Sequence, residues 1–205
     1  MAFNINCTAC PRLADFLSQV RQQYPDYHAL PVAPFGDESP DLLIVGLAPG
    51  MHGANATGRP FTGDYAGVLL YETLFEYGFS NKADSEHVDD GLELINCRIT
   101  NAVKCLPPQN KPVGEEIRQC NAFLQQELQA LAGKKILIAL GSIAHNAVLK
   151  ALGVKQSACK FGHLAEHKLP GDFTLLDSYH CSRYNTQTRR LTPDMFRQVF
   201  ARARG

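Results

Sequence analysis

Residues 44–64 read IVGLAPGMHGANATGRPFTGD, and this stretch decides how the chain folds. An apolar run over residues 41–47 leads directly into a loop that holds five glycines, namely Gly46, Gly50, Gly53, Gly58 and Gly63. Glycine lets a backbone approach a ligand closely, but a loop rich in it is costly to order without one. The loop also carries His52, Phe61 and Asp64, which can hydrogen-bond, stack and exchange protons. It therefore predicts a ligand pocket after the first buried strand.

Apolar runs that read as strands alternate with helical patterns along the rest of the chain. The runs cover residues 41–47, 94–103, 134–140 and 173–179. One helix is expected to open at Cys7 and Cys10, three more are expected at about 62–79, 114–131 and 142–152, and a last one is expected to start at 192–194. Thr62 is expected to cap the second helix, a connector fills residues 25–40, and a short strand or hairpin is expected around 161–168. This alternation predicts an α/β fold: one domain, 1–205, built as a three-layer αβα sandwich around a mostly parallel four-stranded sheet.

Both unusual loops of the chain follow strands. The glycine-rich loop follows residue 46, and the segment from His180 to Leu191 follows the last strand. Because open α/β sheets bind ligands beyond the carboxyl ends of their strands, these two loops are expected to face each other. Asp64 and His180 would then lie across one pocket, although Asp64 alone could also serve the first turn of a helix.

Composition and charge set limits on the partners. The 205 residues carry 20 basic and 20 acidic side chains, no run of about 18 apolar residues, and no basic start followed by an apolar stretch. We therefore expect a cytoplasmic monomer with no membrane contact. Residues 181–205 hold six arginines against Asp194 alone, which fits either phosphate contact or a solvated helix end.

Four of the seven cysteines form two pairs. Cys7 and Cys10 are separated by two residues at the start of a helix, whereas Cys105 lies in a proline-rich loop and Cys120 on the inner face of the next helix. Four thiolates suit either structural zinc or a [4Fe–4S] cluster, and the long spacing from 105 to 120 favours the cluster. The remaining cysteines have no partner pattern, and Cys181 is interpreted as a packing residue.

With these motifs together, the chain resembles the uracil-DNA glycosylase superfamily, and within it the iron–sulfur-containing family 5, or B-type, enzymes. The resemblance runs from Cys7 to the last helix. It rests on the cysteine pattern and on GLAPG at 46–50, HG at 52–53, TGRPFTGD at 57–64, VKCLPP at 103–108, ALG at 139–141 and SYHCSRYNTQT at 178–188.

The resemblance implies a DNA repair enzyme that hydrolyses the N-glycosidic bond of uracil in DNA and leaves an abasic site. Such a reaction requires a flipped-out base, a donor to that base and stabilisation of a cationic sugar. His180 is expected to be the donor, and Asp64 to position water or stabilise the cation. Expected substrate contacts are Ala48, Gly50, His52, Phe61 and Asn101. Expected DNA contacts are Ser182, Arg183, Tyr184 and Asn185, and the expected cluster ligands are Cys7, Cys10, Cys105 and Cys120.

Two positions differ from most of the superfamily. The first motif has no polar side chain at Leu47 or Ala48, a lack that the B-type family shares, and Cys181 stands where sister families often have proline. A pocket without that polar side chain is expected to accept other deaminated bases, such as hypoxanthine. Two rival interpretations are a non-catalytic iron–sulfur DNA-binding protein of the same fold and a nucleotide-binding α/β module. The glycine-rich loop argues against the second interpretation, because it has neither the GxxxxGK[ST] arrangement nor the dinucleotide fingerprint.

Overall fold

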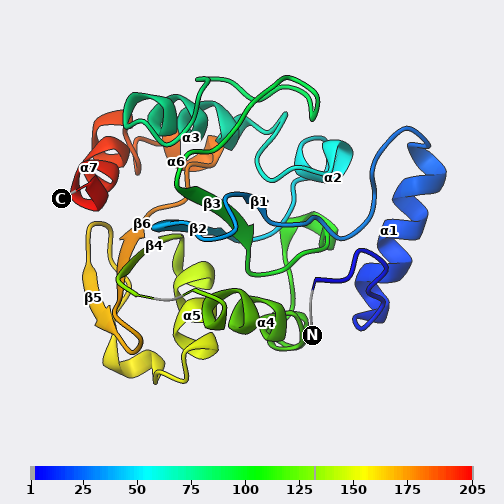
Figure 1. The fold of residues 1–205 in the computed structure, drawn as a ribbon. Coiled ribbons are helices and arrows are strands. Elements are labelled where there is room, and N and C mark those ends of the chain that lie inside the picture. Colours follow the sequence, from blue (N-terminus) through cyan, green and yellow to red (C-terminus); the bar gives the residue numbers. More distant parts are fainter. Residues whose placement is uncertain (1–2, 132, 205) are drawn as a thin grey trace.

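The computed structural model describes residues 3–131 and 133–204. A central sheet is covered by helices on both faces, and one further helix stands at its side (Figure 1). The expected single domain is consistent with this arrangement, although residues 1–2, 132 and 205 lie outside the described part of the chain. None of the described helices is long and apolar enough to cross a membrane.

The sheet has six strands in the order β1-β3-β2-β4-β6-β5. Its middle four strands are parallel, and both edge strands run antiparallel to their neighbours. The strands span β1 Phe35–Gly36, β2 Leu42–Gly46, β3 Cys97–Asn101, β4 Lys135–Leu140, β5 Glu166–Leu169 and β6 Phe173–Ser178. All residues of β2 and β6 are buried, as expected for parallel strands covered on both faces.

Helices α3 and α7 pack on one face of the sheet, and helices α4 and α5 pack on the other. Figure 1 shows these two layers above and below the sheet, with α1 beside them. The helices span α1 Pro11–Gln23, α2 Ala54–Thr57, α3 Tyr65–Glu76, α4 Gly114–Gln129, α5 Ser142–Ala151, α6 Arg183–Gln187 and α7 Pro193–Arg204. The predicted αβα sandwich is therefore confirmed.

Side-chain alternation along the strands separates the two cores. In β2, Leu42 and Ile44 face the α3/α7 side, whereas Leu43 and Val45 face the α4/α5 side. Helix α1 buries Leu13, Leu17 and Val20 in a third cluster together with Cys105 and Cys120. The N-terminal helix is therefore attached beside the sheet at the cysteines.

Two details of the expected fold were wrong. The sheet has six strands rather than four, because two short edge strands extend the parallel core. β1 has only two residues and shows no strand pattern. β5 has no apolar alternation either, but it overlaps the short strand or hairpin expected around 161–168. Thr62 is not the cap of α3, because the helix begins at Tyr65 with Asp64 as its N-cap.

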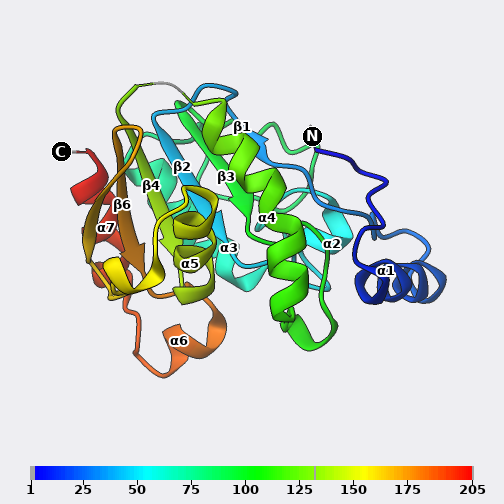
Figure 2. The same ribbon diagram turned by 90° about the horizontal axis from the view of Figure 1, so that it is seen from below.

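The carboxyl ends of the four parallel strands meet at one edge of the sheet. Strand β2 ends at Gly46, β3 at Asn101, β4 at Leu140 and β6 at Ser178. Figure 2 shows α6 beyond this edge, after the end of β6. This edge is the expected place for a ligand site in an open α/β sheet.

Candidate active site

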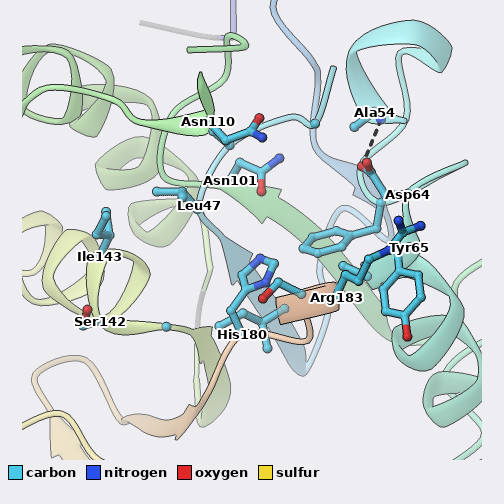
Figure 3. A pocket seen from close by; sticks show the side chains of 17 residues that line it. Leu47, Ala54, Asp64, Tyr65, Asn101, Asn110, Ser142, Ile143, His180 and Arg183 are labelled. Atoms are coloured by element: carbon cyan, nitrogen blue, oxygen red, sulfur yellow. Dashed lines mark hydrogen bonds between the residues drawn. The ribbon is translucent and has the colours of Figure 1, made fainter. Parts of the chain in front are cut away.

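A cavity of about 460 Å³ opens at this edge of the sheet. Both unusual loops line it, as the sequence predicted. Its lining includes Ala48, Gly50, Phe61, Asp64, Asn101 and His180, together with Ser182 and Arg183 of the last loop. Figure 3 shows Asp64, Asn101 and His180 pointing into the same space from different elements.

Asp64 enters this cavity because two glycines leave room for its carboxyl group. A Cβ atom added at Gly50 or Gly53 would overlap the Asp64 carboxylate. The Asp64 side chain does not cap α3; instead, its Oδ2 accepts a 3.1 Å hydrogen bond from the Ala54 N–H (Figure 3). Burial raises the pKa of Asp64, although the Ala54 N–H and nearby His52 act in the opposite direction. The carboxylate is thus held at the cavity with few compensating partners.

Phe61 and Asn101 meet across Gly46. A Cβ at Gly46 would overlap Asn101 Oδ1 and would lie 2.8 Å from Phe61 Cζ. Asn101 is buried, and its Oδ1 accepts no hydrogen bond within the described residues. A buried acceptor of this kind costs free energy unless a ligand supplies the donor. Phe61 holds a left-handed conformation with φ 59°, which is uncommon for a non-glycine residue.

Buried Arg59 holds the glycine-rich loop in place. Its guanidinium forms a 2.6 Å ion pair with Asp90 and donates to Ser85 Oγ at 2.8 Å and to Thr62 Oγ1 at 2.7 Å. It also lies over the Phe35 ring, 5.0 Å from the centroid. These contacts fix the loop immediately before Phe61 and Asp64, so Arg59 supports the site without lining it.

His180 lies opposite Asp64, with its ring stacked on Phe61 at a centroid distance of 6.0 Å. Burial lowers the pKa of His180 to about 4, so the imidazole is neutral at neutral pH. A neutral imidazole retains one N–H, which can donate to a developing anion without first losing a proton. The pair therefore consists of a partly buried carboxylate and a neutral hydrogen-bond donor on two sides of one cavity.

The four residues after Cys181 have different environments. Ser182 Oγ caps α6 by accepting from the Asn185 N–H, and Asn185 Nδ2 donates to the His180 carbonyl at 2.8 Å. Arg183 lies over the Tyr65 ring at 4.8 Å, whereas Tyr184 is 71% exposed. Ser182 and Asn185 thus shape the His180 loop, and Arg183 and Tyr184 form its outer surface.

His52 does not line the cavity, although the sequence interpretation placed it among the substrate contacts. Its ring is exposed, and its Nδ1 lies 2.9 Å from the Tyr27 hydroxyl. Conversely, Tyr65, Asn110 and Ser142 line the cavity and were missed. Tyr65 opens the helix after the glycine-rich loop, and Ser142 opens the helix directly after β4, so their positions were an available signal; Asn110 had none.

The arginines of α7 are engaged by neighbouring side chains. Arg197 pairs with Glu76 at 2.7 Å, Arg202 pairs with Glu166 at 2.8 Å, and Arg204 lies over the Phe79 ring. These contacts favour the interpretation of α7 as a structural helix end over the alternative of phosphate contact.

A second cavity, of about 330 Å³, is lined by all four paired cysteines. Burial, and then the neighbouring Cys120, raise the pKa of Cys10 to about 11, and burial and Cys120 raise the pKa of Cys105 to about 12. Four thiolates at this place therefore need a compensating cation. The Lys104 N–H also donates to Cys120 Sγ at 3.2 Å, a contact that suits a ligating sulfur.

The fold and this site define a class: α/β proteins with a cavity at the strand ends that is lined by a carboxylate and a neutral histidine. The family model of the uracil DNA glycosylase superfamily matches residues 33–204. The chain belongs to this superfamily, and the expected class of enzyme, a uracil-DNA glycosylase, is confirmed.

The chain is similar to type-5 and to type-4 enzymes of this superfamily. The type-5 uracil-DNA glycosylase of Thermus thermophilus is 46% identical over 97% of this chain and 92% of the relative. The type-5 enzyme of Pyrobaculum aerophilum is 41% identical over 97% and 88% of the two chains. A type-4 uracil-DNA glycosylase of the same organism is 35% identical over 72% of this chain and 62% of the relative. Similarity to type-5 enzymes thus extends over nearly the whole chain.

Proposed function

We propose that this enzyme hydrolyses the N-glycosidic bond of uracil in DNA, with Asp64 and His180 as its catalytic residues. One observation carries the proposal: a partly buried carboxylate and a neutral imidazole face the same cavity from loops that follow different strands. The base must leave the stack to reach such a cavity. The similarity to type-5 uracil-DNA glycosylases over nearly the whole chain supports the same reaction.

The two catalytic residues divide the charge that develops. As the bond breaks, the departing uracil gains negative charge, and the His180 N–H donates to its O2 oxygen. The sugar becomes cationic, and the Asp64 carboxylate stabilises it and orients the attacking water. Because burial already raises the free energy of the Asp64 carboxylate, a nearby cation is well compensated there.

The remaining cavity residues hold the flipped base. Phe61 stacks on it, and the free Asn101 Oδ1 accepts from the uracil N3–H. The N–H groups of Ala48 and Gly50 donate no hydrogen bond to the described backbone and reach the base oxygens. Ser182 and Arg183, which line the cavity, contact the DNA together with Tyr184 and Asn185, and the exposed Tyr184 occupies the gap in the stack.

The pocket also accepts hypoxanthine. Leu47 and Ala48 offer no side-chain hydrogen bond to a base, so discrimination depends on backbone groups and on shape. Excision assays with duplexes containing one uracil or one hypoxanthine test this. Release of uracil without any release of hypoxanthine would show that the pocket is selective.

Cys7, Cys10, Cys105 and Cys120 hold a [4Fe–4S] cluster in the second cavity. Tetrahedral zinc with bonds of about 2.3 Å would bring its sulfurs within about 3.8 Å of one another. Among the described residues, no three of these thiols have sulfurs within 4.8 Å of one another, and a cluster spans wider separations. When bound, the cluster supplies a cross-link between α1 and the segment from Cys105 to Cys120. Its role is structural, because hydrolysis needs no electron transfer.

The deciding experiment uses a labelled duplex with one uracil, incubated with the protein and then treated with alkali. The wild type is expected to give strand cleavage at the uracil, and His180→Ala is expected to lose it while still binding the duplex. Binding without cleavage by the wild type would support the rival interpretation, a non-catalytic iron–sulfur DNA-binding protein. Light scattering of the same preparation tests the expected monomer, and cell fractionation tests the expected cytoplasmic location.

A further inference from the structure

A group of buried charged residues lies behind the wall of the active-site cavity and has no part in the reaction described above. Asp177 in β6 is fully buried, and its Oδ1 lies 2.8 Å from His145 Nδ1 in α5. Its Oδ2 lies 3.2 Å from His167 Nε2 in β5 and accepts from the Gly162 N–H at 3.4 Å. A buried carboxylate is costly unless such partners compensate it.

The surroundings of His145 indicate its protonation state. While Nδ1 faces the Asp177 carboxylate, Nε2 lies 3.0 Å from the Cys159 carbonyl oxygen. Both neighbours are acceptors, and only an imidazolium has a proton on each nitrogen. The other described groups facing this ring are the His167 and Phe161 rings. Burial lowers the pKa of His145, but the bonds to Asp177 and Cys159 outweigh it, so that the pKa lies above its ordinary value.

This ion pair joins the two elements that form one wall of the cavity. The backbone N–H of His145 donates to the Gly141 carbonyl oxygen at 3.1 Å. Gly141 and Ser142, at the start of α5, line the cavity. Asp177 is three residues before His180, and the Gly141 N–H donates to Ser178 O at 2.8 Å. Movement of Asp177 relative to His145 would therefore shift the point at which the His180 loop leaves the sheet.

We propose that Asp177, bound to a protonated His145, is a positioning residue that holds His180 against the cavity. The pair acts through the end of β6 and touches no substrate. Loss of the proton from His145 removes one donor from this network and loosens the wall. This inference rests on the proposed glycosylase reaction.

The same three side chains also meet a geometric requirement for metal binding. His145, His167 and Asp177 offer ligand atoms within 4.8 Å of one another, the one such group among the described residues. Yet the separations of 2.8 and 3.2 Å are hydrogen-bond lengths, and ligands of tetrahedral zinc lie about 3.3 Å apart. The geometry favours a proton over a metal ion.

The first test uses the wild-type protein, with its cysteine centre intact and with ¹⁵N-labelled histidine. NMR is expected to show both nitrogens of one buried imidazole protonated at neutral pH, with a midpoint above the ordinary value of 6.5. The single-turnover rate of uracil release is expected to fall with the same midpoint. A neutral His145 at neutral pH, or a rate that is flat through its titration, would overturn the proposal.

Two variants separate positioning from general stability. Asp177→Asn keeps the shape but removes the charge, so His145 should become neutral, the alkaline fall in rate should move to lower pH, and the rate should drop about tenfold with duplex affinity unchanged. His167→Gln retains a donor to Asp177 and should change neither the midpoint nor the rate. An equal loss in both variants would contradict a specific role for the ion pair.

Two further outcomes distinguish a failure of this proposal from a failure of the proposed glycosylase reaction. If zinc raises the melting temperature of the wild type but not of Asp177→Asn, the group binds metal, and the protonic proposal is wrong. If the wild type releases no uracil, the proposed function fails, yet the histidine spectra still report whether His180 shifts when His145 loses its proton.

Discussion

The carboxyl group of Asp64 occupies the space that any side chain at Gly53 would need. Gly53→Ala should therefore displace the carboxylate and lower the single-turnover rate of uracil release by about 100-fold, because small displacements of a reacting group have effects of this size. Gly114→Ala is the matched control, since a Cβ there meets only Arg118 Nη1 at 3.5 Å. Equal activity of the two variants would show that the Asp64 position is not critical.

Asp64→Asn should lower activity but raise stability. Burial raises the pKa of Asp64, so its ionisation at neutral pH costs the folded state free energy that the amide does not. We expect a rate loss of about 10³-fold and a melting temperature above that of the wild type. The gain should disappear below about pH 3, where the carboxyl is protonated in both states. A variant less stable than the wild type at neutral pH would contradict this account.

His180 should make stability depend on pH in the acid range. Burial lowers its pKa to about 4, so between the ordinary value of 6.5 and 4 the unfolded state binds more protons than the folded state. The contribution of neutral His180 to the free energy of unfolding is fully present above pH 6.5 and is lost as pH falls toward 4, by roughly 1–3 kcal/mol. His180→Gln should reduce this slope in urea unfolding series, and the exposed His87→Gln should not. A wild-type slope that persists in His180→Gln would assign it to other groups.

Cys120→Ser should remove the proposed cluster. The wild type is expected to be brown and to contain about four iron atoms per chain, whereas the variant should lose the colour and contain less iron. The variant should also melt at a lower temperature, because α1 loses its cross-link. Cys159→Ser is the control, because Cys159 does not line the cysteine cavity. A Cys120→Ser protein with full stability and activity would remove the structural role of the centre.

The sequence predicts the parallel core strands, because buried apolar runs have a local pattern. It also predicts that Asp64 and His180 line one cavity, because each lies in a loop that follows a strand. It did not indicate the edge strand β1, since Phe35 and Gly36 are too few to show an alternating pattern and pair with Ile99 and Arg98 from a distant part of the chain. The other edge strand, β5, overlaps the short strand or hairpin expected around 161–168. Asn110 reaches the cavity through a left-handed turn (φ 56°), and no pattern indicates such an approach. His145 and Asp177 are 32 residues apart, so only the packing of α5 on β6 reveals their ion pair.

The anchoring of Arg59 has a consequence for engineering the chain. The polar segment 80–92 looks dispensable, because surface loops usually tolerate insertions and deletions. In this protein the segment holds Arg59 from outside the cavity: Ser85 Oγ accepts a hydrogen bond from the guanidinium, and Asp90 forms an ion pair with it. Shortening the segment, or fusing another domain into it, would therefore release the glycine-rich loop and disable the enzyme at a distance. Insertions should be placed instead at the exposed turn around Gly153, which contacts neither loop of the site.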